Sequence, residues 1–154
     1  MDKIKGTGVA LITPFNEDFS IDYDSLEKII NYQINGGIDF LVLMGTTGES
    51  ATLSSQEKME VVTFWKKINN CRLPIVLGIG GNNTFALIEE IKSTNLEGID
   101  AILSVSPYYN KPTQDGIYLH YKMISEICPL PIILYNVPGR TSSNFSARTT
   151  LRLA

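Results

Sequence analysis

Histidine, cysteine and long apolar runs are scarce in this sequence of 154 residues. The single histidine, His120, excludes a histidine-rich metal site, and no metal ion is expected. The two cysteines, Cys71 and Cys128, are too few for the disulfide framework of a small secreted protein, so we expect a reducing, cytoplasmic location. No apolar run approaches the roughly 20 residues that a transmembrane helix needs.

An excess of charge of either sign is also missing. The formal net charge of -3 comes from 13 basic and 16 acidic side chains, which are mixed along the chain. This pattern indicates neither a nucleic-acid groove nor a basic membrane-binding face, so neither partner is expected. With 44% hydrophobic and 19% charged residues, the composition is typical of one globular domain with a sizeable core.

Short apolar runs alternate with helical patterns along the chain. Each run is continuously apolar, as in a strand of a parallel sheet that is covered on both faces. The starts of the runs recur about every thirty residues, which is the length of a βα unit. The runs occupy residues 8–13, 40–44, 73–79, 101–106 and 130–135.

Helix-start signals lie between these runs. Asp22 or Asp24 can cap a first helix, and Ser54 with Glu57 forms a capping box before a second. The remaining expected features are an end of the first helix at Gly36 and Gly37, a third helix capped by Asn83 or Thr84, a fourth that carries Ile117, Tyr121 and Ile124, and a fifth that starts near Ser146.

Two architectures fit a regular βα alternation. One is a doubly wound sheet, which five strands can complete, and the other is a (β/α)8 barrel, which they cannot. In both, the site forms at the carboxyl ends of the strands. The loops expected there carry small, hydroxyl, aromatic or guanidinium groups and span residues 13–14, 45–50, 80–82, 107–110 and 136–141.

Several familiar sites are excluded by these loops. "GTTGES" (45–50) lacks the Gly-Lys-Ser/Thr ending of a phosphate-binding loop, and "GIGGNN" (78–83) has asparagine at the third glycine position of a dinucleotide fingerprint. No Cys, His and carboxylate cluster has metal-ligand spacing. A Ser-His-Asp triad is not supported, because His120 falls mid-helix, where we expect a helix-surface position.

Five loop residues have both an ordinary and a functional interpretation. Thr46 and Thr47 can be turn residues, or two buried hydroxyls that hold a carboxylate or pass a proton. Tyr109 can be a rim aromatic and Tyr135 a core aromatic, or the two can belong to a proton-transfer chain. Arg140 can be a solvated surface residue or a bidentate clamp for a carboxylate. Spacing alone leaves both interpretations open.

The loop sequences "GTTGESATL", "SPYYNKPTQDG" and "ILYNVPGRT" resemble the class I pyruvate-dependent aldolase family. Within that family they resemble the 4-hydroxy-tetrahydrodipicolinate (dihydrodipicolinate) synthases. The arginine of "YNVPGRT" favours these synthases over the N-acetylneuraminate lyases, which typically lack it. The resemblance extends from "GTGVALITPF" to the final "TTLRLA" and so covers the whole chain.

The resemblance implies an α/β fold, a (β/α)8 TIM barrel, in a protein that is usually a homotetramer. It implies a lyase of lysine biosynthesis, with pyruvate and aspartate 4-semialdehyde as substrates and no cofactor beyond a lysine that forms a Schiff base with pyruvate. By analogy, Tyr135 would donate and accept protons near the imine, and Thr46 and Tyr109 would complete the relay. Thr47 would hold the pyruvate carboxylate, and Arg140 the carboxylate of the semialdehyde.

One expected residue is missing from this pattern. The Schiff-base lysine of the family lies on the sixth strand, and residues 1–154 are expected to form the N-terminal part of a single barrel domain, about five βα units, that ends before it. Lys92, Lys111 and Lys122 occupy helices or a loop, not a desolvated strand end. The alternatives are another pyruvate aldolase, such as an N-acetylneuraminate lyase, or a catalytically inactive half-barrel scaffold.

The same resemblance bears on regulation and association. Many members are inhibited by lysine, and sensitive ones typically carry histidine or glutamate where Lys58 stands and glutamate where Ala86 stands. Inhibition by lysine is therefore expected to be weak or absent. A five-stranded part of a barrel also leaves edge strands unpaired, so this chain alone is expected to associate with other chains.

Overall fold

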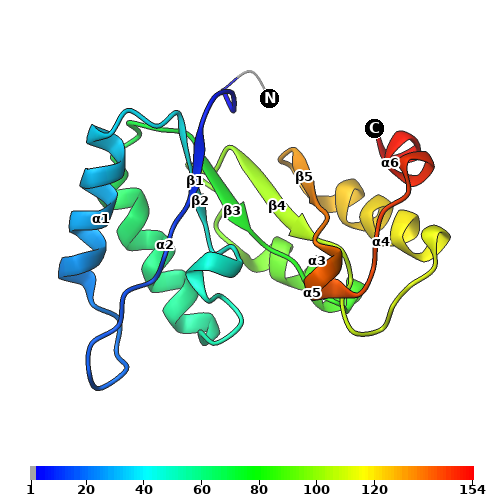
Figure 1. Cartoon of the computed structure of the whole chain (residues 1–154), viewed down its shortest axis with the longest axis horizontal. Helices are drawn as coiled ribbons and strands as arrows, with labels where there is room; N and C mark the ends of the chain where they lie inside the picture. Colours follow the sequence, from blue (N-terminus) through cyan, green and yellow to red (C-terminus); the bar gives the residue numbers. More distant parts are fainter. Residues whose placement is uncertain (1–2) are drawn as a thin grey trace. The chain divides into compact units, whose positions relative to one another are not determined.

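The computed structural model describes residues 3–154, which form two compact units. The first unit runs to Gly78 and includes Gly98–Asp100, and the second comprises Ile79–Glu97 and Ala101–Ala154. Strands and helices alternate along the chain from β1 to α6 (Figure 1). No helix among residues 3–154 combines the length and the apolarity needed to cross a membrane.

The first unit is a parallel βα layer. Its strands β1 (Gly8–Ala10), β2 (Phe40–Leu43) and β3 (Ile75–Gly78) pair in that order, with Val9 opposite Leu41 and Val42 opposite Val76. Helices α1 (Tyr23–Asn35) and α2 (Ser55–Asn69) pack against each other beside these strands (Figure 1). The expected parallel pairing is thus confirmed within this unit.

Capping places these helices where the sequence predicted them. Asp22 accepts a hydrogen bond from the Ser25 amide, 2.9 Å, and so starts α1. Ser54 and Glu57 form the expected capping box at the start of α2. The hydrogen bonds from Ser54 also lower the pKa of the Glu57 carboxyl, because they stabilise its ionised form.

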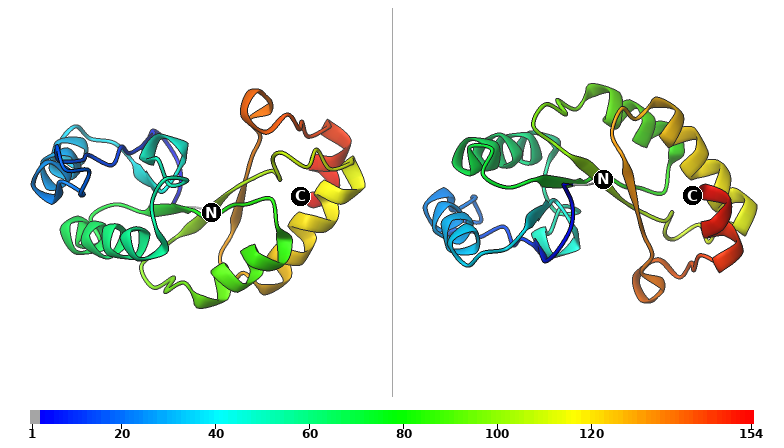
Figure 2. Two further views of the ribbon diagram at one scale, coloured as in Figure 1. Left: turned by 90° about the horizontal axis from the view of Figure 1, so that it is seen from below. Right: turned by 90° about the horizontal axis from the view of Figure 1, so that it is seen from above.

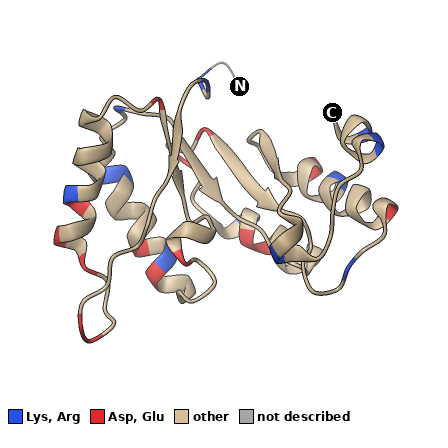
Figure 3. Cartoon of the chain, viewed as in Figure 1, with Lys and Arg blue, Asp and Glu red and all other residues tan. Residues whose placement is uncertain are grey.

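The core of the first unit lies between its helices and strands. Leu26 and Ile30 of α1, Trp65 of α2, and Leu41 and Ile75 of the strands are each at most 2% exposed. Burial of each such side chain contributes roughly 1.5–3 kcal/mol. Both basic and acidic residues occur along α1 and α2 (Figure 3), so neither helix carries charge of a single sign.

The second unit repeats the same architecture. Strands β4 (Ala101–Val105) and β5 (Ile132–Tyr135) are parallel, with Ser104 opposite Leu134 and Val105 opposite Tyr135. Helix α4 (Gln114–Ile127) lies between α3 (Thr84–Ser93) and α6 (Ala147–Leu153), as both views in Figure 2 show. A short helix, α5 (Pro138–Thr141), interrupts the connection from β5 to α6.

The two faces of β4 differ in burial. Ile102 and Ser104 are fully buried, whereas Leu103 and Val105 are only partly buried. The hydroxyl of Tyr121, on α4, donates a 2.8 Å hydrogen bond to the main-chain oxygen of Ser104, so α4 is joined directly to this strand. Because successive side chains of a strand point to opposite faces, Leu103 and Val105 face away from the side chains of Ile102 and Ser104.

Candidate functional site

The "GTTGES" loop of the first unit forms a one-turn 3-10 helix, η1 (Thr46–Gly48), directly after β2. Met44 before it and Glu49 after it both adopt left-handed backbone conformations, each with φ of 54°. The amide of Gly48 donates to the main-chain oxygen of Gly45, 3.1 Å, and the amide of Glu49 to that of Thr46, 3.1 Å. The turn is therefore closed by its own main chain.

Thr13 holds this turn to the end of β1. Its hydroxyl donates a buried hydrogen bond of 2.8 Å to the main-chain oxygen of Gly48. A side chain at Gly48 would lie 3.1 Å from the main-chain oxygen of Leu11, so the tight approach favours glycine. Sequence reasoning did not assign Thr13 a role, although a hydroxyl at the end of a predicted strand was a usable signal.

Gly78 explains how β3 approaches the same turn. A Cβ atom at Gly78 would lie 2.3 Å from the main-chain oxygen of Met44. Only glycine allows a strand to pass this carbonyl without displacing it. Gly78, the first glycine of "GIGGNN", thus has a packing role at the end of β3.

Thr46 and Thr47 are both exposed in the structure, whereas the functional interpretation of these two residues had assumed buried hydroxyls. Both residues lie on the outer surface of η1, beyond the end of β2, while Gly48 takes the buried position. Exposed hydroxyls beside a closed main-chain turn remain accessible to a small ligand. The Thr46 and Thr47 hydroxyls on this turn can therefore form hydrogen bonds with a ligand.

Tyr135 is the last residue of β5 and is partly buried. It lies opposite Val105, and its main-chain oxygen accepts a 3.2 Å hydrogen bond from the Ser106 amide. Its side chain therefore shares a face with that of Val105, the less buried face of β4. In a (β/α)8 barrel this is the face that points into the barrel.

Tyr109 and Arg140 occupy exposed loops at the carboxyl ends of β4 and β5. Tyr109 is 86% exposed and has a left-handed backbone, with φ of 69°. Arg140 is exposed on α5, whose first residue is Pro138. Sequence reasoning placed both residues in loops and missed α5, a four-residue helix too short to produce a periodic pattern.

A set of polar contacts fixes the loop that carries Arg140. Asn136 closes its base, because its Nδ2 donates to Asn144 Oδ1, 2.7 Å, and its Oδ1 accepts from the Phe145 amide, 3.3 Å. Gln114, the first residue of α4, donates from Nε2 to the Asn144 main-chain oxygen, 2.8 Å, and accepts from Thr149 Oγ1, 2.6 Å. The loop is thus attached to α4 as well as to β5.

His120 is buried, with 3% of its surface exposed, and the prediction of a helix-surface position was wrong. The reason is that α4 has α3 on one side and α6 on the other, so a mid-helix position can face a neighbouring helix. His120 Nδ1 lies 2.8 Å from Thr84 Oγ1 on α3. Burial lowers the pKa of the imidazole to about 4, so the ring is neutral near pH 7.

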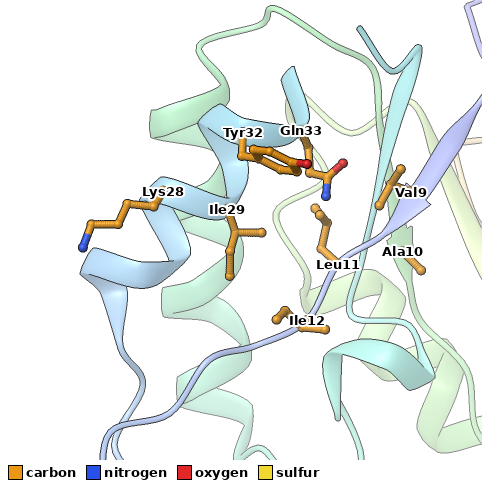
Figure 4. Close-up of a pocket in the computed structure, with 8 residues that line it drawn as sticks. All are labelled: Val9, Ala10, Leu11, Ile12, Lys28, Ile29, Tyr32 and Gln33. Atoms are coloured by element: carbon orange, nitrogen blue, oxygen red, sulfur yellow. The ribbon is translucent and has the colours of Figure 1, made fainter. Parts of the chain in front are cut away.

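A groove of about 370 Å3 lies in the first unit, between the region of β1 and helix α1 (Figure 4). It is lined by residues 9–12 and by Lys28, Ile29, Tyr32 and Gln33, and Lys28 extends away from it. Its lining is mostly apolar, and none of the five predicted site residues contributes to it. The groove is therefore not the candidate site.

The five predicted site residues lie in loops or at a strand end of their own units. Thr46 and Thr47 belong to the first unit, and Tyr109, Tyr135 and Arg140 to the second. Each follows or ends a parallel strand at its carboxyl end. The chemistry on offer is hydrogen bonding to a carboxylate, proton transfer through phenols and hydroxyls, and pairing with an anion.

A family model for the dihydrodipicolinate synthetase family matches residues 3–154. The chain belongs to this family. A 4-hydroxy-tetrahydrodipicolinate synthase of Flavobacterium psychrophilum is 58% identical over 154 residues, which is 100% of this chain and 53% of that protein. The corresponding synthase of Parabacteroides distasonis is 56% identical over 151 residues, 98% of this chain and 51% of that protein.

Solved structures of the family have the same fold as this chain. A chloride-inhibited dihydrodipicolinate synthase from Acinetobacter baumannii, complexed with pyruvate, gives a TM-score of 0.93 at 47% identity and covers 97% of this chain and 52% of its own. The 4-hydroxy-tetrahydrodipicolinate synthase of Methylacidiphilum fumariolicum SolV gives 0.92 at 42% identity, covering 98% and 50%.

Membership of the dihydrodipicolinate synthetase family settles the choice of architecture. The fold class is α/β, a (β/α)8 barrel, of which residues 3–154 carry five βα units. The chain spans about half the length of the curated relatives it matches.

Proposed function

We propose that the full-length protein condenses pyruvate with aspartate 4-semialdehyde to 4-hydroxy-tetrahydrodipicolinate, as a lyase in the diaminopimelate route to lysine. The observation that carries the proposal is the 58% identity, over all 154 residues, to a relative named for this activity. The solved relative with pyruvate bound supports pyruvate as one substrate. The arginine of "YNVPGRT" supports a second substrate that bears a carboxylate.

The proposed reaction joins the two substrates through a lysine. The lysine amine adds to the keto carbon of pyruvate, and water leaves as the imine forms. Loss of a methyl proton gives an enamine, whose carbon attacks the aldehyde carbon of the second substrate, and the new alkoxide takes up a proton. The amine of the second substrate then closes the ring at the imine carbon and releases the lysine.

Five residues of this chain are assigned proposed roles in that reaction. Thr47 holds the pyruvate carboxylate, and Tyr135 transfers protons at the imine and at the new alkoxide. Thr46 and Tyr109 extend the proton relay. Arg140 holds the carboxylate of the semialdehyde, since a guanidinium can bind a carboxylate through two parallel hydrogen bonds. The exposure of Arg140 and Thr47 is compatible with ligand binding.

The lysine nucleophile is proposed to belong to the part of the relatives that this chain does not span. Residues 1–154 would then be the N-terminal part of a single barrel domain. The lysines of the second unit suit the role poorly. Lys92 pairs with Glu89 at 2.8 Å, and Lys122 pairs with Glu126, which raises the pKa of the Lys122 ammonium. A protonated, solvated amine is a poor nucleophile.

We also propose a cytoplasmic homo-oligomer, with a tetramer as the expected state. A solved relative at 39% identity and TM-score 0.93 is described as the first monomeric dihydrodipicolinate synthase variant, which supports association as the usual state of the family. The high exposure of Tyr109 supports contact with another subunit. Sedimentation of the full-length protein tests this, and a monomer would contradict it.

A coupled assay of the full-length protein tests the reaction. We expect turnover of pyruvate with aspartate 4-semialdehyde and none with N-acetylmannosamine, and the reverse preference would support a neuraminate lyase instead. Borohydride reduction in the presence of pyruvate should trap a covalent adduct on the full-length protein. The chain of residues 1–154 alone should give none, and an adduct there would show that one of its own lysines serves.

A further inference from the structure

The last threonine of "YNVPGRT", Thr141, has no part in the proposed chemistry, yet it is among the most buried polar residues of the second unit. Only 2% of its surface is exposed, whereas its neighbour Arg140 is exposed. Thr141 ends α5, and Ser142 after it has a left-handed backbone with φ of 54°. The chain therefore turns at Ser142, two residues after the arginine.

The Thr141 hydroxyl holds this turn through main-chain contacts. Its Oγ1 lies 2.8 Å from the main-chain oxygen of Ser143 and 3.2 Å from that of Val137, so its single proton is donated to one of these carbonyls or shared between them. The same oxygen accepts a hydrogen bond from the Ser143 amide at 3.2 Å. One hydroxyl thus satisfies the amide of a buried residue and also contacts the start of α5.

Ser143 is in turn fixed to the strand that precedes the loop of Tyr109. Its hydroxyl lies 3.2 Å from that of Ser106, the residue after β4, in a buried contact. Thr141, Ser143 and Ser106 therefore form a continuous polar chain from α5 to the end of β4. Arg140 directly precedes Thr141, the first of these three hydroxyl residues.

We propose that Thr141 is a positioning residue: through its hydroxyl it fixes α5 so that Arg140 presents its guanidinium to the carboxylate of the second substrate. This inference rests on the proposed role of Arg140. A hydroxyl is needed because the position must both donate and accept, and valine, which has the same shape, can do neither. Without it, the buried amide of Ser143 loses its partner and the turn loosens.

The test is steady-state kinetics of the full-length protein with Thr141→Val and Thr141→Ser. For Thr141→Val we expect about a tenfold rise in KM for aspartate 4-semialdehyde, equivalent to about 1.4 kcal/mol. The KM for pyruvate should change less than about twofold, because Thr47 is on a different loop. Thr141→Ser keeps the hydroxyl and should stay within about twofold of the wild type on both measures.

Epistasis with Arg140 separates positioning from a general loss of structure. In an Arg140→Ala background, Thr141→Val should raise the KM for aspartate 4-semialdehyde by less than about a further twofold, because the guanidinium that Thr141 positions is absent. Thr150→Val serves as the matched control, since its hydroxyl also donates to a main-chain oxygen, that of Ser146 at 3.2 Å, but in an exposed position on α6. It should leave both KM values unchanged.

Three results would overturn the inference. They are an unchanged KM for the semialdehyde in Thr141→Val, an equal rise in both KM values, and a rise that persists in full in the Arg140→Ala background. If Thr141→Val does not fold, Thr141→Ala removes the same hydroxyl with less steric demand and carries the same expectations. If the wild type is inactive, or Arg140→Ala leaves the semialdehyde KM unchanged, the proposed function or the role of Arg140 has failed instead.

Discussion

The hydroxyl of Thr13 donates a buried hydrogen bond of 2.8 Å to the main-chain oxygen of Gly48, and this contact ties the end of β1 to η1, 35 positions further along the chain. The oxygen of Gly48 is not used by the 3-10 turn itself, which is closed through the oxygens of Gly45 and Thr46. A side chain at the end of one strand therefore completes the loop at the end of the next.

Replacement of Thr13 by valine should destabilise the protein by about 1–3 kcal/mol, because the buried oxygen of Gly48 would lose its partner. Urea unfolding measures the change. Thr52→Val is the matched control, since its hydroxyl donates at 2.9 Å to the main-chain oxygen of Glu49 in an exposed position. The control should cost less than about 0.5 kcal/mol. Equal costs for the two variants would contradict this assignment.

Gly78→Ala should be among the most damaging single-methyl changes in the first unit. The new Cβ would lie 2.3 Å from the main-chain oxygen of Met44, so β3 or the turn must move. Overpacking of this kind costs typically about 1–3 kcal/mol or more. Gly45→Ala is the control, because among residues 3–154 no atom beyond its chain neighbours lies within 4 Å of the added methyl group. Thermal unfolding should separate the two variants, and a neutral Gly78→Ala would refute the packing role.

The sequence predicted most of the fold because local signals and the fold agree. The caps at Asp22, Ser54 and Asn83 start their helices where they were expected. The strands lie within the predicted apolar runs but are shorter, as β1 shows: it covers Gly8–Ala10 of the predicted run 8–13. Where a strand ends depends on its hydrogen bonds to the neighbouring strand, and these cannot be seen in the sequence.

The differences from expectation concern burial, which depends on neighbours far along the chain: the expected surface position of His120 was wrong, and the assumption of buried hydroxyls at Thr46 and Thr47 does not hold. His120 lies on the same helical face as Ile117, Tyr121 and Ile124, three residues after Ile117 and four before Ile124, and this spacing was a signal of burial that its residue type obscured. On that face Thr84 of α3 contacts its ring. Thr46 and Thr47 follow a buried strand, yet they are exposed because left-handed Met44 redirects the chain at the strand end. A left-handed backbone at a non-glycine residue such as Met44 leaves no compositional signal, so no pattern in the sequence indicated the exposure of Thr46 and Thr47.

Insensitivity to lysine stays a prediction for the full-length protein. Lys58, partly buried on α2, carries a positive charge that repels a lysine ammonium. Ala86, exposed on α3, has no carboxylate that could bind this ammonium. A lysine titration at saturating pyruvate should show little inhibition in the sub-millimolar range. Lys58→Glu combined with Ala86→Glu should increase sensitivity, and strong inhibition of the wild type would contradict the prediction.

His120 should make the stability of the protein fall as the solution is acidified. Burial lowers the pKa of its imidazole from 6.5 to about 4, so below pH 6.5 the unfolded chain binds a proton that the folded chain does not. The stabilisation is complete above about pH 6.5 and is lost progressively as the pH falls towards 4. A shift of this size corresponds to at most about 3 kcal/mol.

The measurement is urea unfolding of the wild type and of His120→Gln at about pH 7, above the interval in which the stabilisation is lost, and at about pH 4.5, near its lower end. Glutamine keeps polar groups for Thr84 but does not titrate, so the variant should lose less stability on acidification than the wild type does. Carboxylates that titrate in this range act on both proteins alike, and the difference between the two slopes isolates the imidazole. If the free energy of unfolding fell equally with pH in both proteins, His120 would take up its proton as readily in the folded protein as in the unfolded chain. Its burial against α3 would then not govern its charge.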